Sequence, residues 1–335
     1  MDESITEFDL DYVIGLIEDA RTKAYRAVNT ILIDLYWEIG KHISQQIVSG
    51  KWGAGVVENL ASRIRQHDAS IRGFSAQNLW RMKQFYDTYR DSKKLSTLLR
   101  ELTWSANILI IAKAQTAEER EFYLRLAVKN KLSVRELERQ IGSSYYERTV
   151  MGMQKLPMLL KEAHPTLPLV FRDTYVLDFL KLPETHSEKQ LQHSIVSNLR
   201  QFLLETGHDM SFVGQEYRLQ VGRSDYFVDL LFYHRELRCL VAFELKIDDF
   251  KPEYLGKMQF YLEALDRQTK KEHENPSVGI ILCKTKDDEV VEVALSRSMS
   301  PALVAEYRTK LMDKSILQGK LREFFALAEG SEPED

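Results

Sequence analysis

Residues 226–246 read YFVDLLFYHRELRCLVAFELK, and this stretch decides the fold of the C-terminal half of the chain. Apolar and aromatic residues with a few polar ones between them fill 226–234 and again 237–246. Such a pattern predicts two β-strands, and the short interruption at 235–236 predicts a tight turn between them. We therefore expect an antiparallel β-hairpin at the centre of this half.

Two carboxylates and a lysine mark one face of the predicted hairpin. Side chains alternate between the faces of a strand, so Glu244 shares a face with Ala242 and Lys246. If the turn sets Asp229 opposite Ala242, Glu244 becomes the diagonal same-face neighbour of Asp229. A shift of the register by one residue would put the two carboxylates on opposite faces. A shared site therefore requires a particular register.

The residue types in this cluster point to cleavage of a phosphodiester with the help of a divalent cation. Two carboxylates without a thiol or an imidazole suit a hard ion such as Mg²⁺, with Mn²⁺ as a substitute. Such an ion polarises a phosphodiester and lowers the pKa of bound water. Lys246 can orient that water or stabilise charge on the phosphate. The alternative is a surface hairpin with a cross-strand ion pair.

The elements around the hairpin predict the rest of the fold. A helix is expected over 187–205, opened by a capping box between Ser187 and Gln190, and a strand at about 216–221. These elements indicate a mixed sheet with an αβββαβ core. All eight prolines lie at or after Pro157, and the preceding half carries apolar residues at helical spacing. The fold class is therefore α+β, with an all-α domain followed by an α/β domain.

Composition excludes several classes of protein. The 335 residues are 44% hydrophobic with a net charge of −4, which is unlike a disordered chain. No apolar run reaches the length of a membrane span, and the first residues lack the pattern of a signal peptide. Cys239 and Cys283 are too few for a disulfide framework or a cysteine zinc site. We expect a cytoplasmic protein without a membrane partner.

Basic character is concentrated in the helical half. Residues 51–100 contain 10 basic and 4 acidic side chains. The text GFSAQNLWRMKQFY within this segment begins a helix after Ser75, a plausible N-cap, and follows another helical pattern. Two short helices joined by a glycine-containing turn resemble a helix-turn-helix, and an ordinary helical hairpin is the alternative. The candidate nucleic-acid contacts are Arg63, Arg65, Arg81 and Lys83.

The wider text resembles the YhcG-type PDDEXK nuclease family. The resemblance rests on FVDLLFYHRELRCLVAFELKIDDFKPEYLGKMQFYLEALD and the following NPSVGIILCK. Within it, Asp229 and the Glu244-Leu-Lys246 triplet match the PD-(D/E)XK signature, with Val228 where the signature has proline. The segments YWEIGKHI, GFSAQNLWRMKQFY and REFYLRLAVKNKLSVRELERQI resemble the helical domain of that family. The resemblance implies a restriction-endonuclease-like α/β domain with a mixed sheet.

This resemblance implies roles for the residues of the signature. Asp229 and Glu244 would be ligands of the metal, and the Leu245 carbonyl would be another. Lys246 would be the catalytic lysine.

Outside the signature the match is less regular. Gln259 matches a glutamine of RecB-like members, but Tyr261 follows it more closely than the tyrosine of many such nucleases. Glu188 and Glu216 are two candidates for the upstream acid of the metal site. At position 192, where many relatives are expected to have Glu, this chain has Gln.

These observations predict four segments. Residues 1–145 form a helical domain that binds DNA or a partner, and residues 146–186 form a connecting region. Residues 187–325 form the nuclease domain, and residues 326–335 form an acidic tail.

The predicted function is metal-dependent, endonucleolytic cleavage of DNA, with RNA left open as a substrate. A homodimer is a further expectation, because cutting both strands at once needs two sites. Another is a protein partner in a bacterial defence or mobile-element system, and a role in DNA recombination or repair is equally compatible. Two alternatives remain: a non-catalytic nucleic-acid-binding module with a vestigial nuclease fold, and a complex-assembly subunit.

Overall fold

The computed structural model describes residues 7–152, 171–207, 209–296, 301–311 and 319. The chain divides into two compact units, Met1–Ile141 and Gly142–Asp335. The predicted acidic tail and much of the predicted connecting region lie outside the described residues. None of the helices within these ranges is long and apolar enough to cross a membrane.

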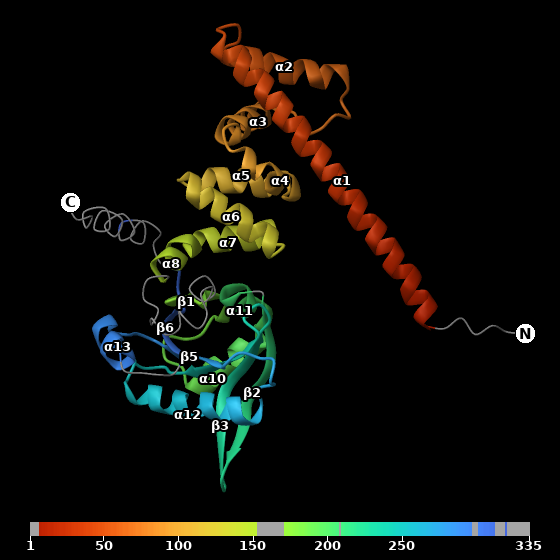
Figure 1. The fold of residues 1–335 in the computed structure, drawn as a ribbon. Helices are drawn as coiled ribbons and strands as arrows, with labels where there is room; N and C mark the ends of the chain where they lie inside the picture. The colour runs from red at the N-terminus through yellow and green to blue at the C-terminus, as the bar shows by residue number, and fades with distance from the viewer. Residues whose placement is uncertain (1–6, 153–170, 208, 297–300, 312–318, 320–335) are drawn as a thin grey trace, which may run out of the picture. The chain divides into compact units, whose positions relative to one another are not determined.

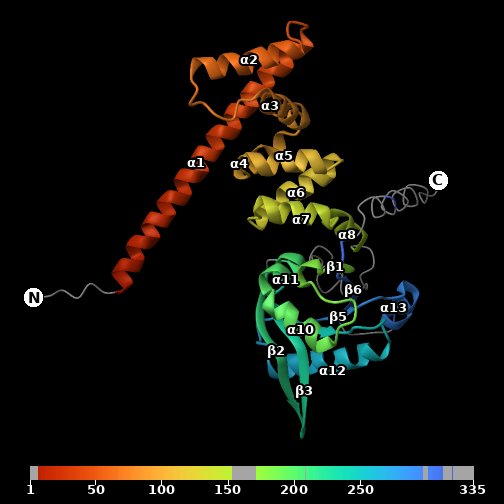
Figure 2. The same ribbon diagram turned by 180° about the vertical axis from the view of Figure 1, so that it is seen from behind.

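The N-terminal unit is built from helices (Figures 1 and 2). Their bounds are α1 (Glu7–Val48), α2 (Ala54–His67), α3 (Ala76–Tyr89), α4 (Ser96–Glu101), α5 (Trp104–Lys113), α6 (Ala117–Lys129) and α7 (Val134–Gly142). The all-α character predicted for this half is confirmed.

Helix α3 shows how the sequence positions these helices. The Ser75 side chain caps it by accepting a hydrogen bond from the Asn78 N–H, as predicted. Leu79 and Met82 of α3 are fully buried in a core that includes the C-terminal half of α1. A Cβ added at Gly40 of α1 would overlap the main-chain carbonyl of Met82. A glycine at this position therefore allows the two helix backbones to approach closely.

The connection between α2 and α3 bears on the predicted helix-turn-helix. It runs from residue 68 to residue 75, whereas a helix-turn-helix has a turn of roughly 3–4 residues. The helix-turn-helix therefore stays a prediction, and the longer connection favours the alternative of an ordinary helical hairpin.

The C-terminal unit combines a sheet with helices on both of its faces (Figure 1). Helix α8 (Tyr145–Gly152) and strand β1 (Thr174–Val176) come first, so the predicted connecting region contributes a strand to the sheet. The following elements are α10 (Glu188–Ser197), α11 (Leu199–Thr206), β2 (Met210–Val221), β3 (Ser224–His234), β4 (Cys239–Leu245), α12 (Glu253–Gln268), β5 (Val278–Cys283), α13 (Asp288–Leu295) and β6 (Ala302–Arg308).

The sheet is mixed, as the αβββαβ pattern predicted. Across the described residues it has six strands in the order β1-β6-β5-β4-β3-β2. Strands β2, β3 and β4 pair in an antiparallel manner, whereas β4, β5, β6 and β1 are parallel. Helix α12 connects β4 to β5, which is the crossover that parallel neighbours require.

Two apolar cores cover the faces of the sheet. On one face, Leu191 and Ile195 of α10 and Phe202 of α11 pack with inward residues such as Phe243. On the other face, residues of α12 such as Met258 and Leu262 pack against strand residues that include Leu231, Ala242 and Ile281. The sheet is thus buried on both faces, which explains the nearly continuous apolar text of β4 and β5.

Two details differ from the sequence-based expectation. The helix predicted over 187–205 is two helices, α10 and α11, which meet at Asn198. The Asn198 amide donates to the Ser194 carbonyl and ends α10, because a short polar side chain competes for main-chain hydrogen bonds. The predicted tight turn at 235–236 is a four-residue connection, 235–238, in which Arg238 has a φ of 49°.

Candidate active site

The register of β3 and β4 brings Asp229 and Glu244 together. Leu231 pairs with Ala242, and Leu230 pairs with Phe243, so continuing the ladder by one residue sets Asp229 beside Glu244. The prediction that Asp229 lies opposite Ala242 is therefore wrong by two residues, because the connection has four residues instead of two. A shift of two residues preserves the face of every side chain, so the shared face survives the error.

Glu244 is the most buried member of the group, with a solvent exposure of 0%. Its Oε1 accepts hydrogen bonds from Lys257 Nζ at 2.5 Å and lies 2.9 Å from Lys246 Nζ. Its Oε2 is buried and has no hydrogen-bond partner within the described part of the chain. Buried carboxylate oxygens are normally satisfied, so this oxygen has an open position for a cation or a water.

Lys246 follows the last residue of β4 and lies among acceptors. Its Nζ is 3.2 Å from both carboxylate oxygens of Glu188 and 3.1 Å from the Leu245 carbonyl oxygen. The side chain is 11% exposed. Burial alone would lower the pKa of Lys246, but its contacts with Glu244 and Glu188 raise the pKa above the usual value. Lys246 is therefore an ammonium group beside the two carboxylates.

Asp229 is held by the main chain of the neighbouring strand. Its Oδ2 accepts a hydrogen bond from the Leu245 N–H at 2.7 Å. Burial, and after it the charge of Glu244, raises the pKa of Asp229 to about 6. The Gln192 amide donates to the main-chain carbonyl of Asp229 at 2.7 Å. The glutamine at this position thus supports the backbone that presents Asp229.

The two candidates for the upstream acid lie in different surroundings. Glu188 begins α10 and contacts Lys246, with 44% of its side chain exposed. Glu216 lies on β2, is exposed, and has a left-handed φ of 44°. Among the described residues, no group of three or more His, Cys, Asp or Glu side chains is placed to hold a metal. Within the described part of the chain, neither Glu188 nor Glu216 therefore forms a three-carboxylate metal site with Asp229 and Glu244.

Helix α12 contributes a residue that the sequence analysis missed. Lys257 contacts Glu244, and its Nζ lies 5.3 Å from the centre of the Tyr261 ring. The contact with Glu244 raises the pKa of Lys257 despite burial, which acts in the opposite direction. Gln259 is half-buried two residues along the same helix, and about 200° around its axis from Lys257. The spacing of four residues between Lys257 and Tyr261 is the signal that could have identified this lysine.

The donor set fits a hard divalent cation. The Asp229 carboxylate, the open Oε2 of Glu244 and the Leu245 carbonyl are oxygen donors, and Mg²⁺ is commonly held by one or two carboxylates plus waters and substrate phosphate. Lys246 and Lys257 supply positive charge at the same place. Such an arrangement can bind a phosphate and orient a water molecule.

The predicted nucleic-acid contacts all lie in the N-terminal unit. Arg63 and Arg65 on α2 and Arg81 on α3 are exposed. Lys83 is half-buried and forms an ion pair with Asp87 at 2.5 Å, one helical turn away. Its charge is therefore already compensated, whereas the three arginines face solvent.

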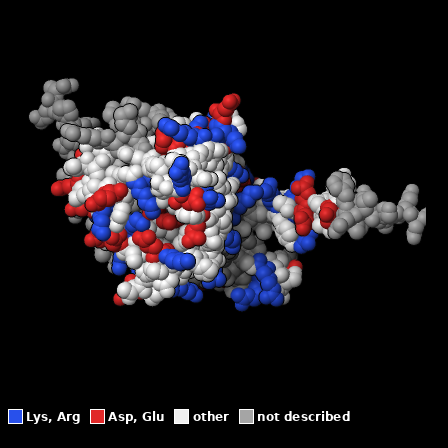
Figure 3. All heavy atoms as spheres, turned by 90° about the horizontal axis from the view of Figure 1, so that it is seen from below, with Lys and Arg blue, Asp and Glu red and all other residues white. Residues whose placement is uncertain are grey.

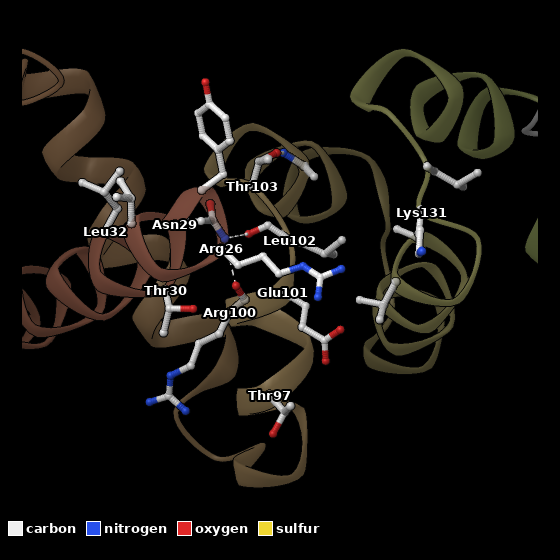
Figure 4. Close-up of a pocket in the computed structure, with 16 residues that line it drawn as sticks. Arg26, Asn29, Thr30, Leu32, Thr97, Arg100, Glu101, Leu102, Thr103 and Lys131 are labelled. Atoms are coloured by element: carbon white, nitrogen blue, oxygen red, sulfur yellow. Dashed lines mark hydrogen bonds between the residues drawn. The ribbon is translucent and has the colours of Figure 1, made fainter. Parts of the chain in front are cut away.

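The surface charge and a cavity of the N-terminal unit give no further candidate for the site. Figure 3 shows a face on which Lys and Arg lie among Asp and Glu, without a continuous area of one sign. Figure 4 shows a cavity of about 860 Å³ in the N-terminal unit, lined by residues of α1, α4 and α6 among others. Asn29 crosses it to donate hydrogen bonds to the Arg100 and Leu102 carbonyls. This cavity contains none of the predicted site residues.

Comparisons with known proteins agree with the geometry of the C-terminal unit. Residues 169–322 match the family described as YhcG PDDEXK nuclease domain, and residues 12–148 match the DUF1016 N-terminal domain. The chain is 32% identical to "Putative nuclease YhcG" of Escherichia coli strain K12, over 93% of this chain and 92% of that protein.

A solved structure, the crystal structure of a repair endonuclease from Pyrococcus abyssi, matches 38% of this chain and 49% of its own, with 16% identity and a TM-score of 0.27. The family matches and the extent of the similarity to YhcG confirm the resemblance seen in the sequence. The chain belongs to the YhcG family of PDDEXK nucleases, with a DUF1016 N-terminal domain ahead of the PDDEXK domain.

Proposed function

We propose that this protein is a metal-dependent nuclease that hydrolyses phosphodiester bonds in DNA. The observation that carries the proposal is the fully buried Glu244, which has two lysine partners on one oxygen and, among the described residues, no hydrogen-bond partner on the other. Buried carboxylate oxygens are normally satisfied, and here the one without a partner belongs to a residue that lies beside a second carboxylate, Asp229. The open oxygen is the position that a metal ligand requires.

Each residue of the site has a proposed role. Asp229 and Glu244 hold Mg²⁺, together with the Leu245 carbonyl. A bound Mg²⁺ would supply Lewis acidity at the phosphate and lower the pKa of a bound water. Lys246 positions the attacking water and stabilises the charge that develops on the phosphate. Glu188 holds the Lys246 ammonium in place, and this contact supports a positioning role in preference to metal ligation.

The remaining predicted residues have weaker support. Gln259 lies on α12 two residues from Lys257, and we propose that it contacts the substrate and not the metal. Glu216 is exposed on β2, with no acidic cluster around it within the described residues. Lys257 is the stronger candidate for a substrate contact from α12, because it already lies against Glu244.

Contacts with DNA are proposed on both units. In the N-terminal unit they are the exposed Arg63, Arg65 and Arg81, which suit phosphates. In the C-terminal unit the β2–β3 hairpin continues directly from Asp229 and carries Arg223 in its turn. Phe227, two residues before Asp229, is 48% exposed. The exposed ring near Asp229 suits a base, and the arginine in the hairpin turn suits a phosphate farther along the nucleic acid.

The test is cleavage of supercoiled plasmid, branched DNA, single-stranded DNA and RNA, each with Mg²⁺, Mn²⁺ or EDTA. Wild type is compared with Lys246→Ala and Asp229→Asn, and with Lys251→Ala as a matched control. Lys251 is an exposed lysine of the same domain, paired with Asp248 and outside the proposed machinery. We expect metal-dependent cutting that is lost in the first two variants and retained in the control.

Two results would contradict the proposal. Cutting that survives both substitutions would remove the assignment of the site. If the folded protein binds DNA but cuts none of these substrates with either metal, the alternative of a non-catalytic binding module gains support. Mn²⁺ binding followed by electron paramagnetic resonance gives a readout that is independent of cleavage, and Asp229→Asn should weaken it.

A further inference from the structure

Strand β3 changes the face that it presents to each core at Asp229. Leu230 and Phe232 pack in the core that contains residues of α10 and α11. Val228, two positions before Leu230, packs in the opposite core, which contains residues of α12. Side chains two positions apart lie on the same face of a regular strand, so β3 is rotated about its own axis between Val228 and Leu230. Asp229 lies at this rotation.

Glu216 is the residue of β2 that lies opposite Asp229. Gln215 pairs with Leu230, and the register is unchanged at the pair on the other side, which sets Glu216 across from Asp229. Glu216 has a φ of 44°, in the left-handed region, whereas residues of antiparallel strands have a φ of about −140°. Along the described lengths of β2 and β3, no other residue except glycine has a positive φ. The unusual backbone conformation and the rotation of β3 therefore coincide.

The ladder between β3 and β4 also ends at this point. The last pair toward the site joins Leu230 to Phe243. A regular antiparallel ladder would next bond the Leu245 N–H to the main chain of β3, but this N–H donates to Oδ2 of Asp229 at 2.7 Å. The carboxylate thus replaces a main-chain acceptor. Its place beside Glu244 depends on how β3 is turned.

The side chain of Glu216 does not explain its conformation. Its carboxylate is exposed and belongs to no acidic cluster within the part of the chain that the structure describes. A residue with a Cβ is disfavoured sterically in the left-handed region. Such residues persist where the surrounding structure requires them, and they concentrate at functional sites. The contribution of this position is therefore its backbone conformation.

We propose that Glu216 is a positioning residue that acts through its backbone. The left-handed conformation of Glu216 rotates β3, and the rotation directs the Asp229 carboxylate toward Glu244 and the Leu245 N–H. This role differs from that of a third carboxylate ligand, for which Glu216 was a candidate. The consequence for metal binding rests on the proposed function, because it takes Asp229 as a ligand, whereas the position of Asp229 can be measured without metal.

The test compares substitutions that remove the same carboxylate and differ in backbone preference. Glu216→Gly favours the left-handed region, whereas Glu216→Val strongly disfavours it. Glu216→Gln changes the charge and keeps an unbranched side chain. Glu216→Thr has the same branching as valine with a polar group, and it replaces the valine variant if that variant does not fold. Because Glu216 is exposed, none of these changes leaves a cavity.

The first measurement is the amide proton resonance of Leu245 in metal-free protein labelled with ¹⁵N-leucine. Removal of its acceptor in Asp229→Ala should move this resonance upfield, since the hydrogen bond to a carboxylate is lost. We expect Glu216→Val to move it in the same direction, and Glu216→Gly and Glu216→Gln to leave it at the wild-type position. An unchanged resonance in the folded valine or threonine variant would overturn the proposal, because the rest of the fold would then set the rotation.

The second measurement is the Kd for Mn²⁺, by electron paramagnetic resonance. Glu216→Val should raise the Kd by ~10–100-fold, as is typical when a group that orients a ligand is lost, and the glycine and glutamine variants should stay within ~2-fold of wild type. If glycine and glutamine weaken binding as much as valine, Glu216 acts through its carboxylate and the proposal is wrong. If wild type binds no Mn²⁺, the proposed function fails, and the Leu245 resonance still decides the role of Glu216.

Discussion

Two carboxylates of the C-terminal unit, Glu205 and Glu244, are both 0% exposed, yet their surroundings differ. Glu205 Oε1 accepts from Arg148 at 2.5 Å and from the Val176 N–H at 2.8 Å. Arg148 in turn donates to the main-chain carbonyls of Ser143 and Thr174. This group, which we name the structural pair, connects α8, α11 and β1.

Glu244 has the same burial but an incomplete set of partners. Two lysines approach one of its oxygens, and the other has none among the residues described. Asp229 beside it has a pKa raised to about 6. The comparison teaches that burial of a charge does not identify a functional site. The distinguishing features of Glu244 are two lysines on one carboxylate oxygen, an oxygen that lacks a hydrogen-bond partner among the described residues, and a second carboxylate alongside.

The largest effect is expected from breaking the structural pair. Arg148→Met leaves Glu205 buried without its cation and should lower the free energy of unfolding by about 3–5 kcal/mol. Urea unfolding measures this loss. The double variant Arg148→Met, Glu205→Leu should recover most of it, because no uncompensated charge remains. A single variant as stable as wild type would show that the pair does not hold the fold.

An effect of similar size, on the rate of cleavage, is expected from a substitution in the candidate active site. Lys246→Ala should reduce the rate of metal-dependent cleavage by roughly 10²–10³-fold, because charge on the phosphate loses its stabilising partner. Stability should change by no more than about 1 kcal/mol, since Glu244 keeps Lys257 and Glu188 is partly exposed. Cleavage rates and urea unfolding are measured on the same preparation. A large loss of stability would place Lys246 with the structural pair instead.

The raised pKa of Asp229 predicts a substitution that makes the protein more stable than wild type. In metal-free protein, Asp229→Asn should increase stability at pH ~8 by up to about 3 kcal/mol, which corresponds to the rise of the pKa from 3.8 to about 6. The folded state holds the proton more tightly than the unfolded state, so the wild type loses stability as pH rises from ~4 to above 6. Asparagine does not ionise, so the Asp229→Asn variant does not lose stability in this way as pH rises.

Urea unfolding in EDTA at pH ~4 and pH ~8 tests this prediction, and the two proteins should be nearly equal at the lower pH. Adding Mg²⁺ should stabilise wild type and not the variant, because only wild type retains both carboxylate ligands. If the difference in the free energy of unfolding between variant and wild type is the same at both pH values, the charge of Asp229 does not destabilise the fold.

The smallest effect is expected at the β2–β3 hairpin. Arg223→Ala should weaken DNA binding by about 2–10-fold and reduce its salt dependence, as expected for one phosphate contact. Phe227→Ala should weaken binding of single-stranded DNA more than of duplex, because a ring stacks on unpaired bases. Fluorescence anisotropy at several salt concentrations measures both. Unchanged affinities would confine DNA recognition to the carboxylate site and the N-terminal unit.

Much of this arrangement follows from local patterns in the sequence. Short apolar and aromatic runs separated by a polar interruption identified β3 and β4, and the capping boxes and proline distribution identified the helices. The period of two along a strand also placed Asp229 and Glu244 on one face. That conclusion survived a register error of two residues, because it depends only on whether the shift is even or odd.

Other features depended on contacts that local patterns do not contain. The length of the β3–β4 connection, the break at Asn198 and the ion pair that occupies Lys83 come from competing hydrogen bonds and charges. Lys257 was missed because it approaches Glu244 only when α12 packs on the sheet. Glu188 was one of two candidates for the upstream acid, and packing of α10 brings it into contact with Lys246.

The sequence by itself determined the family through its resemblance, and it determined the fold class and the shared face of Asp229 and Glu244, because periodicity and motif spacing act over short stretches of chain. Only the tertiary structure decided which buried charge is satisfied and which is left open. It alone also showed that apolar side chains in the N-terminal half of α1, such as Ile17 and Ile31, are exposed to solvent. Both properties are sums over neighbours that are distant in sequence, and folding is what brings those neighbours together.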